Sequence, residues 1–413
     1  MAESPPERLH ALDAVRGFAL TAGIVFHATL SFLPTPHGHG IWIITDNHPS
    51  LVLSVLFHLL HTFRMTTFFL IAGFFAHLTF HRRGQRAFIA DRAKRIGVPL
   101  IAGWPFVFAA IVAVTIWAAI QGAQGGPLPK APPYAGFPAF PLTHLWFLYL
   151  LLWFYAAILA LRAASSALDK GGRLGRAADR AVGTLVGSPL GLVVLATPAA
   201  VALALTPQWL AWFGVPTPDS SLVPNPAALA AYFTAFGFGW LLHRRTDLLE
   251  TVRRRWPLNL TAAIACSVAG FGIVGIAPLV HPLTGLDQVA FAGVYSLASW
   301  TWTFALIGLA LQFLNGHSPV RRYLADASYW LYIAHMPIVM ALQTVVAPLA
   351  WPWPVKFAVI LGVAFPLMLA SYELLVRHSF IGAILNGRRV PWTRMSASGL
   401  LAAADSPQAR ARS

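Results

Sequence analysis

Long apolar runs alternate along this chain with short segments that carry proline, glycine or basic residues. A run of about 20 mostly apolar residues is long enough to cross a bilayer as a helix. The pattern predicts about ten such spans, at residues 11–33, 55–80, 96–120, 143–163, 189–206, 226–242, 258–280, 288–314, 324–348 and 355–376. We therefore expect an all-α fold, a polytopic membrane helix bundle, with a transmembrane domain over 1–380 and a disordered cytoplasmic tail over 381–413.

Composition agrees with this class, because 57% of the 413 residues are hydrophobic and only 10% are charged. The net charge of +15 comes from basic clusters between alternate spans, as in cytoplasmic loops under the positive-inside rule. The opposite loops hold only Lys130 and, at the last edge, Lys356 as basic residues. This asymmetry predicts that both termini are cytoplasmic, and it argues against nucleic acid as a partner.

Three further features of the sequence narrow the class of protein. The single cysteine, Cys266, allows no intramolecular disulfide and no cysteine cluster for a metal. The first span is too long for a cleavable signal and contains Arg16, so we expect it to stay in the protein. The proline-, glycine- and aromatic-rich outer loops, such as 127–141, suit short structured caps.

The first span carries three ionisable residues, Asp13, Arg16 and His27. Arg16 and His27 are close to three helical turns apart, so they share one face at a separation of about 16 Å. Asp13 lies one turn from Arg16 and can pair with it, although both also suit interfacial residues that extend to the headgroups. His27 lies about 22 Å into a core about 30 Å thick, where ionisable groups usually mark a function.

The second span repeats this anomaly, with His58, His61 and Arg64 on one helical stripe. Taken by itself, Arg64 could extend outward to the headgroups. Three polar groups on one stripe instead favour a polar cavity.

At the mouth of the third span, Arg92 and Arg95 are one turn apart. Such a pair can bind phosphate with two guanidinium groups, or it can simply be a topology signal.

The ninth span contains another stripe, formed by Ser328, Tyr332 and His335, with His335 at a depth close to that of His27. His335 is explained equally well as a core histidine hydrogen-bonded to Tyr332 or Ser328 and as a catalytic histidine.

His144 and Trp146 open the fourth span, where we expect them to anchor an outer aromatic belt. In the first outer loop, His37, His39 and His48 lack the set of carboxylate or cysteine ligands that we would expect beside them at a metal site, so we expect no metal.

Five motifs in order resemble the integral-membrane acyltransferase family 3: RLHALDAVRGFAL with Arg16 and His27, TFFLIAGFF (67–75), Arg92 with Arg95, HLWFL (144–148) and ASYWLYIAHMPI (327–338). Within that family the sequence of these segments is most similar to the glucan-biosynthesis group, whose members resemble succinyltransferases of osmoregulated periplasmic glucans. In one departure, Ala72 stands where many members have serine, so we give that position no catalytic role.

The resemblance implies an enzyme of the bacterial inner membrane that needs no cofactor and takes acyl-coenzyme A as co-substrate. Arg92 and Arg95 would bind the donor phosphates, and His27, with Arg16 near the donor's path, would act as general base or carry the acyl group itself. The group that orients His27 would be Tyr332, Ser328 or His335. Arg64 would pair with a succinyl carboxylate, or serve the acceptor if the donor is acetyl. The acceptor would contact His61 and His58.

Two other functions remain open from the sequence. One is an O-acetyltransferase of another cell-surface polysaccharide. The other is a secondary transporter or flippase of an anionic glycoconjugate, because buried arginine and histidine also occur in proton-coupled transport. No inverted repeat is visible in the sequence to favour the second. The partners expected are acyl-coenzyme A, a periplasmic glucan or other glycan, and membrane lipid.

Overall fold

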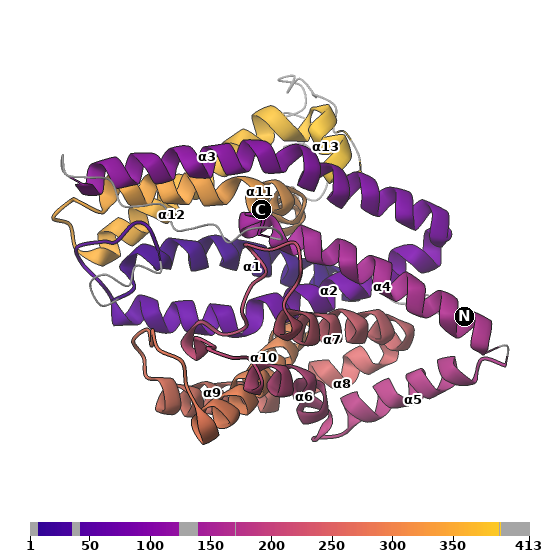
Figure 1. Cartoon of the computed structure of the whole chain (residues 1–413). Helices are drawn as coiled ribbons and strands as arrows, with labels where there is room; N and C mark the ends of the chain where they lie inside the picture. The colour runs from indigo at the N-terminus through magenta and orange to yellow at the C-terminus, as the bar shows by residue number, and fades with distance from the viewer. Residues whose placement is uncertain (1–6, 35–41, 124–138, 170, 388, 390–413) are drawn as a thin grey trace, which may run out of the picture.

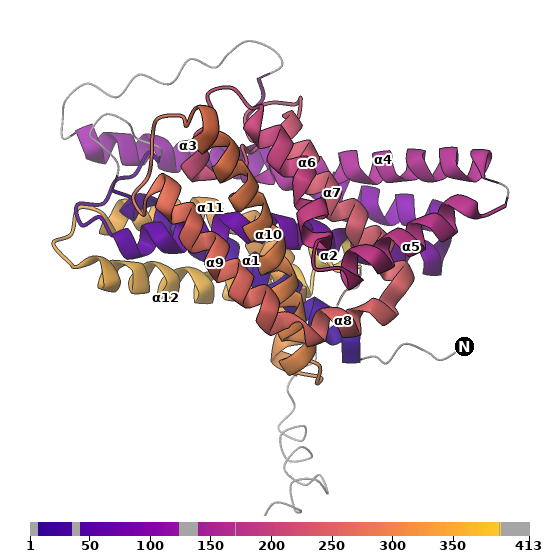
Figure 2. The ribbon, with the colours of Figure 1, turned by 90° about the horizontal axis from the view of Figure 1, so that it is seen from below.

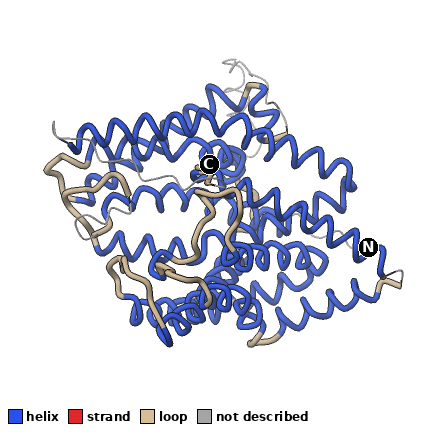
Figure 3. The backbone as a smooth tube through the Cα atoms, in the orientation of Figure 1, coloured by secondary structure: helices blue, strands red, loops and turns tan. Residues whose placement is uncertain are grey.

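The computed structural model describes residues 7–34, 42–123, 139–169, 171–387 and 389. These residues form helices and loops with no strand, and one isolated bridge joins Ala139 to Ser221 (Figure 3). The expected all-helical fold class is therefore confirmed for the described part of the chain.

The helices follow the apolar runs of the sequence. The principal ones are α1 (Glu7–Thr29), α2 (Leu51–Arg92), α3 (Val98–Ala123), α4 (Trp146–Leu168), α5 (Arg173–Gly187), α6 (Gly191–Ala204), α7 (Pro226–Leu242), α9 (Trp256–Val274), α10 (Gly285–Phe313), α11 (Pro319–Val346) and α12 (Trp353–Ser371). Shorter turns are η1 (Leu30–Phe32), η2 (Ala93–Gly97), η3 (Thr143–Leu145), η4 (Ala211–Phe213), η5 (His243–Leu248), α8 (Leu249–Arg254), η6 (Tyr372–Arg377) and α13 (Phe380–Leu385).

Seven helical runs among the described residues are long and apolar enough to cross a membrane, or up to eight if the bent pair α5 and α6 forms one span. The run Leu51–Gly122 counts once, although it contains two of the ten expected spans. Helix α7, at 17 residues, is shorter than the average span. A multi-pass membrane protein is thus supported, and the number ten stays a prediction.

The connection from α2 to α3 differs from expectation. The basic segment after residue 80 is helical instead of a loop, and a five-residue π-helix, η2, joins α2 to α3. The chain turns at Gly84, whose φ of 75° is a conformation that residues with a side chain rarely adopt. Arg92 at the end of α2 and Arg95 in η2 therefore lie on helical backbone that follows the kink at Gly84.

The basic residues before the expected span 189–206 are also helical. They form α5, which meets α6 at an angle of 101°. At this corner, a Cβ on Gly191 would lie 1.7 Å from the carbonyl oxygen of Leu185, so only glycine fits. Arg244 of η5 binds Asp179 of α5 at 2.6 and 2.8 Å and fixes α5 against the end of α7.

Helices α1 and α2 lie in the middle of the bundle, with α3, α11 and α12 on one side and α6 to α10 on the other (Figure 1). Helix α1 contacts α2, α10 and α11. Figure 2 shows α9 and α10 packed side by side, and α10 in turn contacts α1. The helix that carries His27 is therefore enclosed by protein on several sides.

The contact between α2 and α7 depends on two glycines. A Cβ on Gly73 would lie 1.9 Å from the Phe236 carbonyl oxygen, and one on Gly239 would lie 1.9 Å from the Leu70 carbonyl oxygen. The backbones can approach this closely because neither residue has a side chain. This packing gives a structural reason for the glycine in the segment 67–75.

Two loops at the other end of the bundle are held by buried contacts. The Lys356 ammonium is fully buried and donates to Asp46 at 2.9 and 3.0 Å, which ties the loop after α1 to α12. In the loop between α6 and α7, the side chains of Trp209 and Trp212 are buried. Gln288 of α10 donates to the carbonyl oxygens of Leu203, Ala204 and Thr206. The 207–225 loop is thus a structured cap, as expected.

The boundary expected at residue 380 falls at the start of α13. Helix α13 contacts η2, and Arg95 Nε donates to the Leu385 carbonyl oxygen at 3.0 Å. The first residues of the expected tail are therefore ordered against the body, and 390–413 lie outside the described residues.

Candidate active site

Two cavities meet inside the bundle. We call the larger the histidine chamber, a cavity of about 570 Å³ lined by His27, His61, Arg64, His144 and His335 among others. We call the smaller the arginine chamber, a cavity of about 260 Å³ lined by Arg16, Arg92, Arg95 and Ser328 among others. Four side chains line both cavities and form the constriction between them: Leu20, Phe68, Phe147 and Tyr332.

His27 and His335 face each other across the histidine chamber, with ring centroids 5.1 Å apart. His335 Nδ1 donates to the Tyr332 carbonyl oxygen at 2.7 Å, so a neutral ring carries its lone pair on Nε2. His335 Nε2 and His27 Nδ1 are buried and have no hydrogen-bond partner among the described residues. Two buried imidazoles with free ring nitrogens suit proton transfer better than a structural role.

Of the three candidates to orient His27, only His335 contacts its ring. The Tyr332 hydroxyl donates to the His144 carbonyl oxygen at 2.6 Å. Ser328 donates to the Ala325 carbonyl oxygen at 2.8 Å and lines the arginine chamber instead. Ser328 therefore lies on the side of the arginine chamber, away from His27.

His144 lies in the wall of the histidine chamber, not in an aromatic belt facing lipid. Its ring is 4.9 Å from that of His335 and its Nε2 donates to the Ile333 carbonyl oxygen at 3.2 Å. Its position directly before an apolar helix looks like that of an interfacial anchor, so local sequence carries no sign of this burial. The chamber consequently holds three adjacent histidines, on α1, η3 and α11.

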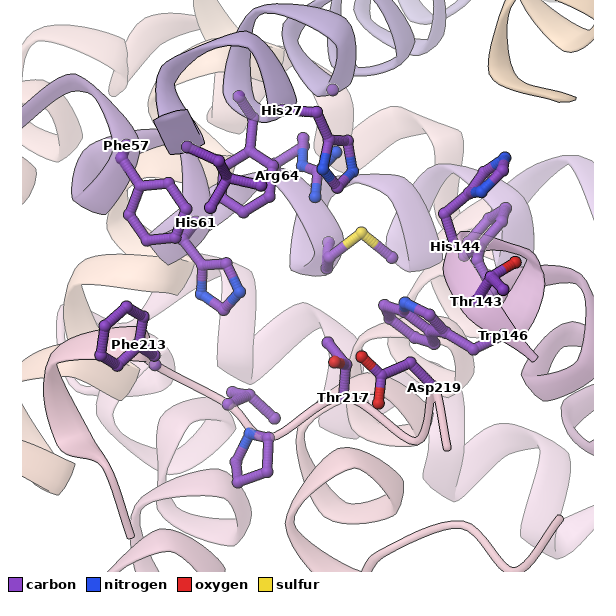
Figure 4. Close-up of a pocket in the computed structure, with 18 of the residues that line it drawn as sticks. His27, Phe57, His61, Arg64, Thr143, His144, Trp146, Phe213, Thr217 and Asp219 are labelled. Carbon is purple, nitrogen blue, oxygen red and sulfur yellow. The ribbon is translucent and has the colours of Figure 1, made fainter. Parts of the chain in front are cut away.

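The side chain of Arg64 lies beside that of His27 in the chamber (Figure 4). Its Cζ lies 4.4 Å from the Phe26 ring centroid, and a Cβ on Gly23 would lie 2.5 Å from its Nη1. No carboxylate within the described residues pairs with it, and Nε is buried without a hydrogen-bond partner. An unpaired cation in such a site is costly, which makes Arg64 a candidate for binding an anionic group.

The stripe on α2 divides between two environments. His61 lines the chamber with Arg64 and lies 3.3 Å from the Tyr295 hydroxyl. His58 does not line it, because its Nδ1 donates to the Trp212 carbonyl oxygen at 3.0 Å and its ring packs against Phe271. The structure thus places His61 and Arg64 at the site, and His58 behind the outer cap.

The arginine chamber gathers basic residues from α1, α2 and η2. Arg16 pairs with Asp13 at 3.2 Å, as the one-turn spacing predicts. Arg92 donates to Thr79 Oγ1 at 3.0 Å. Asp91, which the sequence analysis did not single out, lies 3.4 Å from Arg92 and 3.7 Å from Arg95. Asp91 can hold both guanidinium groups in position while most of their donors stay available.

One further residue braces the site without lining either cavity. Gln343 of α11 is fully buried and donates to the His27 carbonyl oxygen at 3.0 Å. Its Oε1 accepts a hydrogen bond from Trp42 Nε1 at 2.9 Å. A neutral amide inside an apolar span is the sequence signal that points to such a residue.

No group of three or more potential metal ligands occurs among the described residues. His48 lies 2.7 Å from the Asn47 side chain, whereas His37 and His39 fall outside the described residues. Most polar residues of the two chambers carry imidazoles, guanidinium groups or hydroxyls, which suit acid–base chemistry and anion binding.

Comparison with known proteins identifies the family of the chain. Two similar relatives are named Glucans biosynthesis protein C, from Escherichia coli (strain SMS-3-5 / SECEC) at 28% identity and from Escherichia coli O1:K1 / APEC at 27% identity. Each match covers 157 residues, which are 36% of this chain and 37% of the relative's length. No solved structure matches the chain significantly. The family described as an acyltransferase domain matches residues 9–373, nearly the whole chain, and the chain belongs to this family of acyl-transferring enzymes.

Proposed function

We propose that this protein is a membrane O-acyltransferase that moves an acyl group, succinyl in the first instance, from cytoplasmic acyl-coenzyme A to hydroxyl groups of a periplasmic glucan. The observation that carries the proposal is the pair of adjacent chambers, whose linings share four side chains: Leu20, Phe68, Phe147 and Tyr332. An anionic donor suits the arginine-lined side, and proton transfer suits the histidine-lined side.

In the proposed reaction, a glycan hydroxyl attacks the thioester carbonyl carbon in the histidine chamber. The new C–O bond forms as the C–S bond breaks, and His27 takes the hydroxyl proton and passes it to the leaving thiolate. His335, whose Nε2 lone pair faces the same cavity, would hold the protonated His27 ring. In a two-step variant, His27 attacks the thioester carbonyl carbon, the C–S bond breaks and coenzyme A leaves as the thiolate. The glycan hydroxyl then attacks the acyl carbon, the bond to His27 breaks, and the hydroxyl proton passes to the thiolate or to the Nε2 of His335.

Arg64 supports succinyl as the donor group. Its guanidinium lies one helical turn from His27, against Gly23, and has no carboxylate partner among the described residues. A succinyl thioester held near His27 would present its free carboxylate to Arg64 at the other end of a four-carbon chain. An acetyl group offers nothing to pair with this charge.

The proposed topology has ten spans, both termini in the cytoplasm and the histidine chamber reached from the periplasm. Basic segments that are distant in sequence lie together in the structure: Arg162 of α4 lies over Phe80 of α2, and Arg244 pairs with Asp179. Labelling of single cysteines at positions 219 and 247 in a Cys266→Ser background tests this. A membrane-impermeant reagent should label only position 219 from outside.

The direct test uses purified protein in lipid nanodiscs with succinyl-coenzyme A and a neutral glucan. We expect release of free coenzyme A that depends on glucan, together with a mass increase of the glucan by about 100 Da for each hydroxyl hydrogen that a succinyl group replaces. Acetyl-coenzyme A in a parallel reaction distinguishes the acetyltransferase alternative. Movement of a glycoconjugate across the membrane without coenzyme A release would instead favour the transporter.

A further inference from the structure

The wall of the histidine chamber opposite Arg64 is built by the cap between α6 and α7, together with η3. Asp219 and Thr217 lie across the open space from His61 and Arg64, and Thr143 and Trp146 lie beside them (Figure 4). None of these four residues has a role in the reaction as proposed above. They supply a carboxylate, two hydroxyls and an indole to one wall of the chamber.

This wall is a built structure. Thr143 N donates to the Asp219 carbonyl oxygen at 3.1 Å, and Phe140 N donates to the Ser220 carbonyl oxygen at 3.0 Å. At the other end of the cap, Gly214 has a φ of 68°, and a Cβ there would lie 2.5 Å from His61 Nδ1. The cap is therefore fixed against both η3 and α2, so the position of Asp219 relative to His61 is determined by the fold.

Two polar groups in this wall are available to a ligand. The Thr143 hydroxyl is buried with no hydrogen-bond partner among the described residues, and the residue has a φ of 53°, a strained conformation for a β-branched side chain. The Asp219 carboxylate forms no ion pair within the described part of the chain. Asp219 lines the chamber and is exposed to solvent. Desolvation by the surrounding protein raises the pKa of its carboxyl, and hydrogen bonds from Thr217 and Ser220 offset part of the shift.

We propose that Asp219 and Thr143 form the subsite that binds the hydroxyl groups of the glycan acceptor, facing the acyl group held between His27 and Arg64. A carboxylate accepts hydrogen bonds from two neighbouring hydroxyls of one sugar, and the Thr143 hydroxyl accepts or donates one more. The subsite also selects for charge, because Asp219 repels an acidic sugar that Arg64 would otherwise attract. The acceptor class is therefore a neutral, hydroxyl-rich glycan. This inference rests on the proposed acyltransferase function.

The test measures steady-state acyl transfer to a neutral glucose oligosaccharide. Asp219→Ala should raise the acceptor KM about 10- to 100-fold, the range expected for losing a hydrogen bond to a charged group, while the donor KM and acyl-coenzyme A hydrolysis without glycan stay near those of the parent. Thr143→Ala should raise the acceptor KM by a smaller factor, about ten-fold. Asp287→Ala is the matched control, since Asp287 is exposed in the first turn of α10 and lines neither chamber.

A second comparison separates binding from a structural role. Asp219→Asn keeps the size of the side chain and removes its charge, so it should improve transfer to a carboxylated oligosaccharide relative to the neutral one of equal length. An unchanged acceptor KM in Asp219→Ala, or an unchanged preference between the two oligosaccharides in Asp219→Asn, would overturn the subsite while leaving the proposed function standing. Failure of the parent protein to acylate any glycan would instead remove the proposed function itself.

Discussion

The side-chain amide of Gln343 on α11 donates a hydrogen bond to the backbone carbonyl oxygen of His27 on α1 at 3.0 Å. This carbonyl lies near the end of α1, where helical oxygens lose their intrahelical partners. The same amide group accepts from Trp42 Nε1, so one residue joins α1, α11 and the loop after α1. The orientation of His27 therefore depends on a residue that touches neither chamber.

Replacing this residue gives the first prediction. Gln343→Met should lower kcat for acyl transfer about ten-fold or more with little change in either KM, because His27 remains present but is less well positioned. Gln288→Met is the matched control, since Gln288 binds in a similar way the carbonyl oxygens at the end of α6, where the cap begins. That variant should change the acceptor KM more than kcat. Equal effects of the two substitutions on both constants would indicate general destabilisation.

His27 carries the second prediction. His27→Ala should insert and fold normally, because the chamber tolerates a smaller side chain, but acyl transfer should fall by about 10²–10⁴, the usual cost of losing a general base. Steady-state transfer by purified protein measures this. His48→Ala, which changes a histidine that lines neither chamber, should retain parental activity. Transfer by His27→Ala within about ten-fold of the parent would remove His27 from the chemistry.

The sequence predicted the elements better than the loops. Long apolar runs fix helices such as α10 and α12. The depths of His27 and His335 along their spans are similar, and the structure shows that both line one cavity with Arg64. Asp219 could not be placed in this way, because its position depends on contacts of a cap that has no periodicity. The burial of His144 likewise depends on packing against α11, which local sequence does not reveal.

The turn between α2 and α3 shows the same limit. Basic residues after an apolar run normally indicate a loop, and only Gly84 in that segment hinted at a sharp turn within a helix. Asp91 was overlooked because it is a single acid among many bases, yet it lies between Arg92 and Arg95. Local charge patterns predict the side of the membrane, whereas the geometry of the arginine chamber depends on the fold.

A third prediction concerns the glycine packed between α2 and α7. Gly73→Ala should destabilise the protein, because its Cβ would lie 1.9 Å from the Phe236 carbonyl oxygen and would force the two helices apart. Gly103→Ala in α3 is the control, since a Cβ there meets no atom within 4 Å. It should be neutral or stabilising by up to about 1 kcal/mol, the difference in helix propensity. Thermal unfolding in detergent distinguishes the two, and equal midpoints would contradict the close packing.

The fourth prediction tests what Arg64 binds. Arg64→Gln keeps a polar side chain of similar length and removes the charge, so succinyl transfer should fall much more than acetyl transfer. A lost charge-assisted hydrogen bond of about 1.5–3 kcal/mol corresponds to a difference of about 10- to 100-fold between the two donors. Parallel measurements of kcat/KM with succinyl- and acetyl-coenzyme A provide the test. An equal loss with both donors would assign Arg64 to the acceptor or to the packing of α1 on α2.

The last prediction concerns the arginine chamber. Arg92→Ala and Arg95→Ala should each raise the donor KM about ten-fold or more with little change in the acceptor KM, because each removes a charge-assisted bond to phosphate. Arg95→Ala should also reduce stability, since its Nε donates to the Leu385 carbonyl oxygen at 3.0 Å. Arg92→Lys should restore binding only in part, as it keeps the charge and loses the planar group that binds phosphate at two points.

Two further variants make this test specific to the donor. Arg82→Ala removes an exposed arginine of the same basic segment that lines neither chamber, so the donor KM should not change. Asp91→Asn should weaken donor binding although it removes a negative charge, because Asp91 positions both arginines. A purely electrostatic role would give tighter binding instead. If Arg92→Ala and Arg95→Ala with verified topology bind donor as tightly as the parent, these arginines serve only as topology signals, and the donor binds elsewhere.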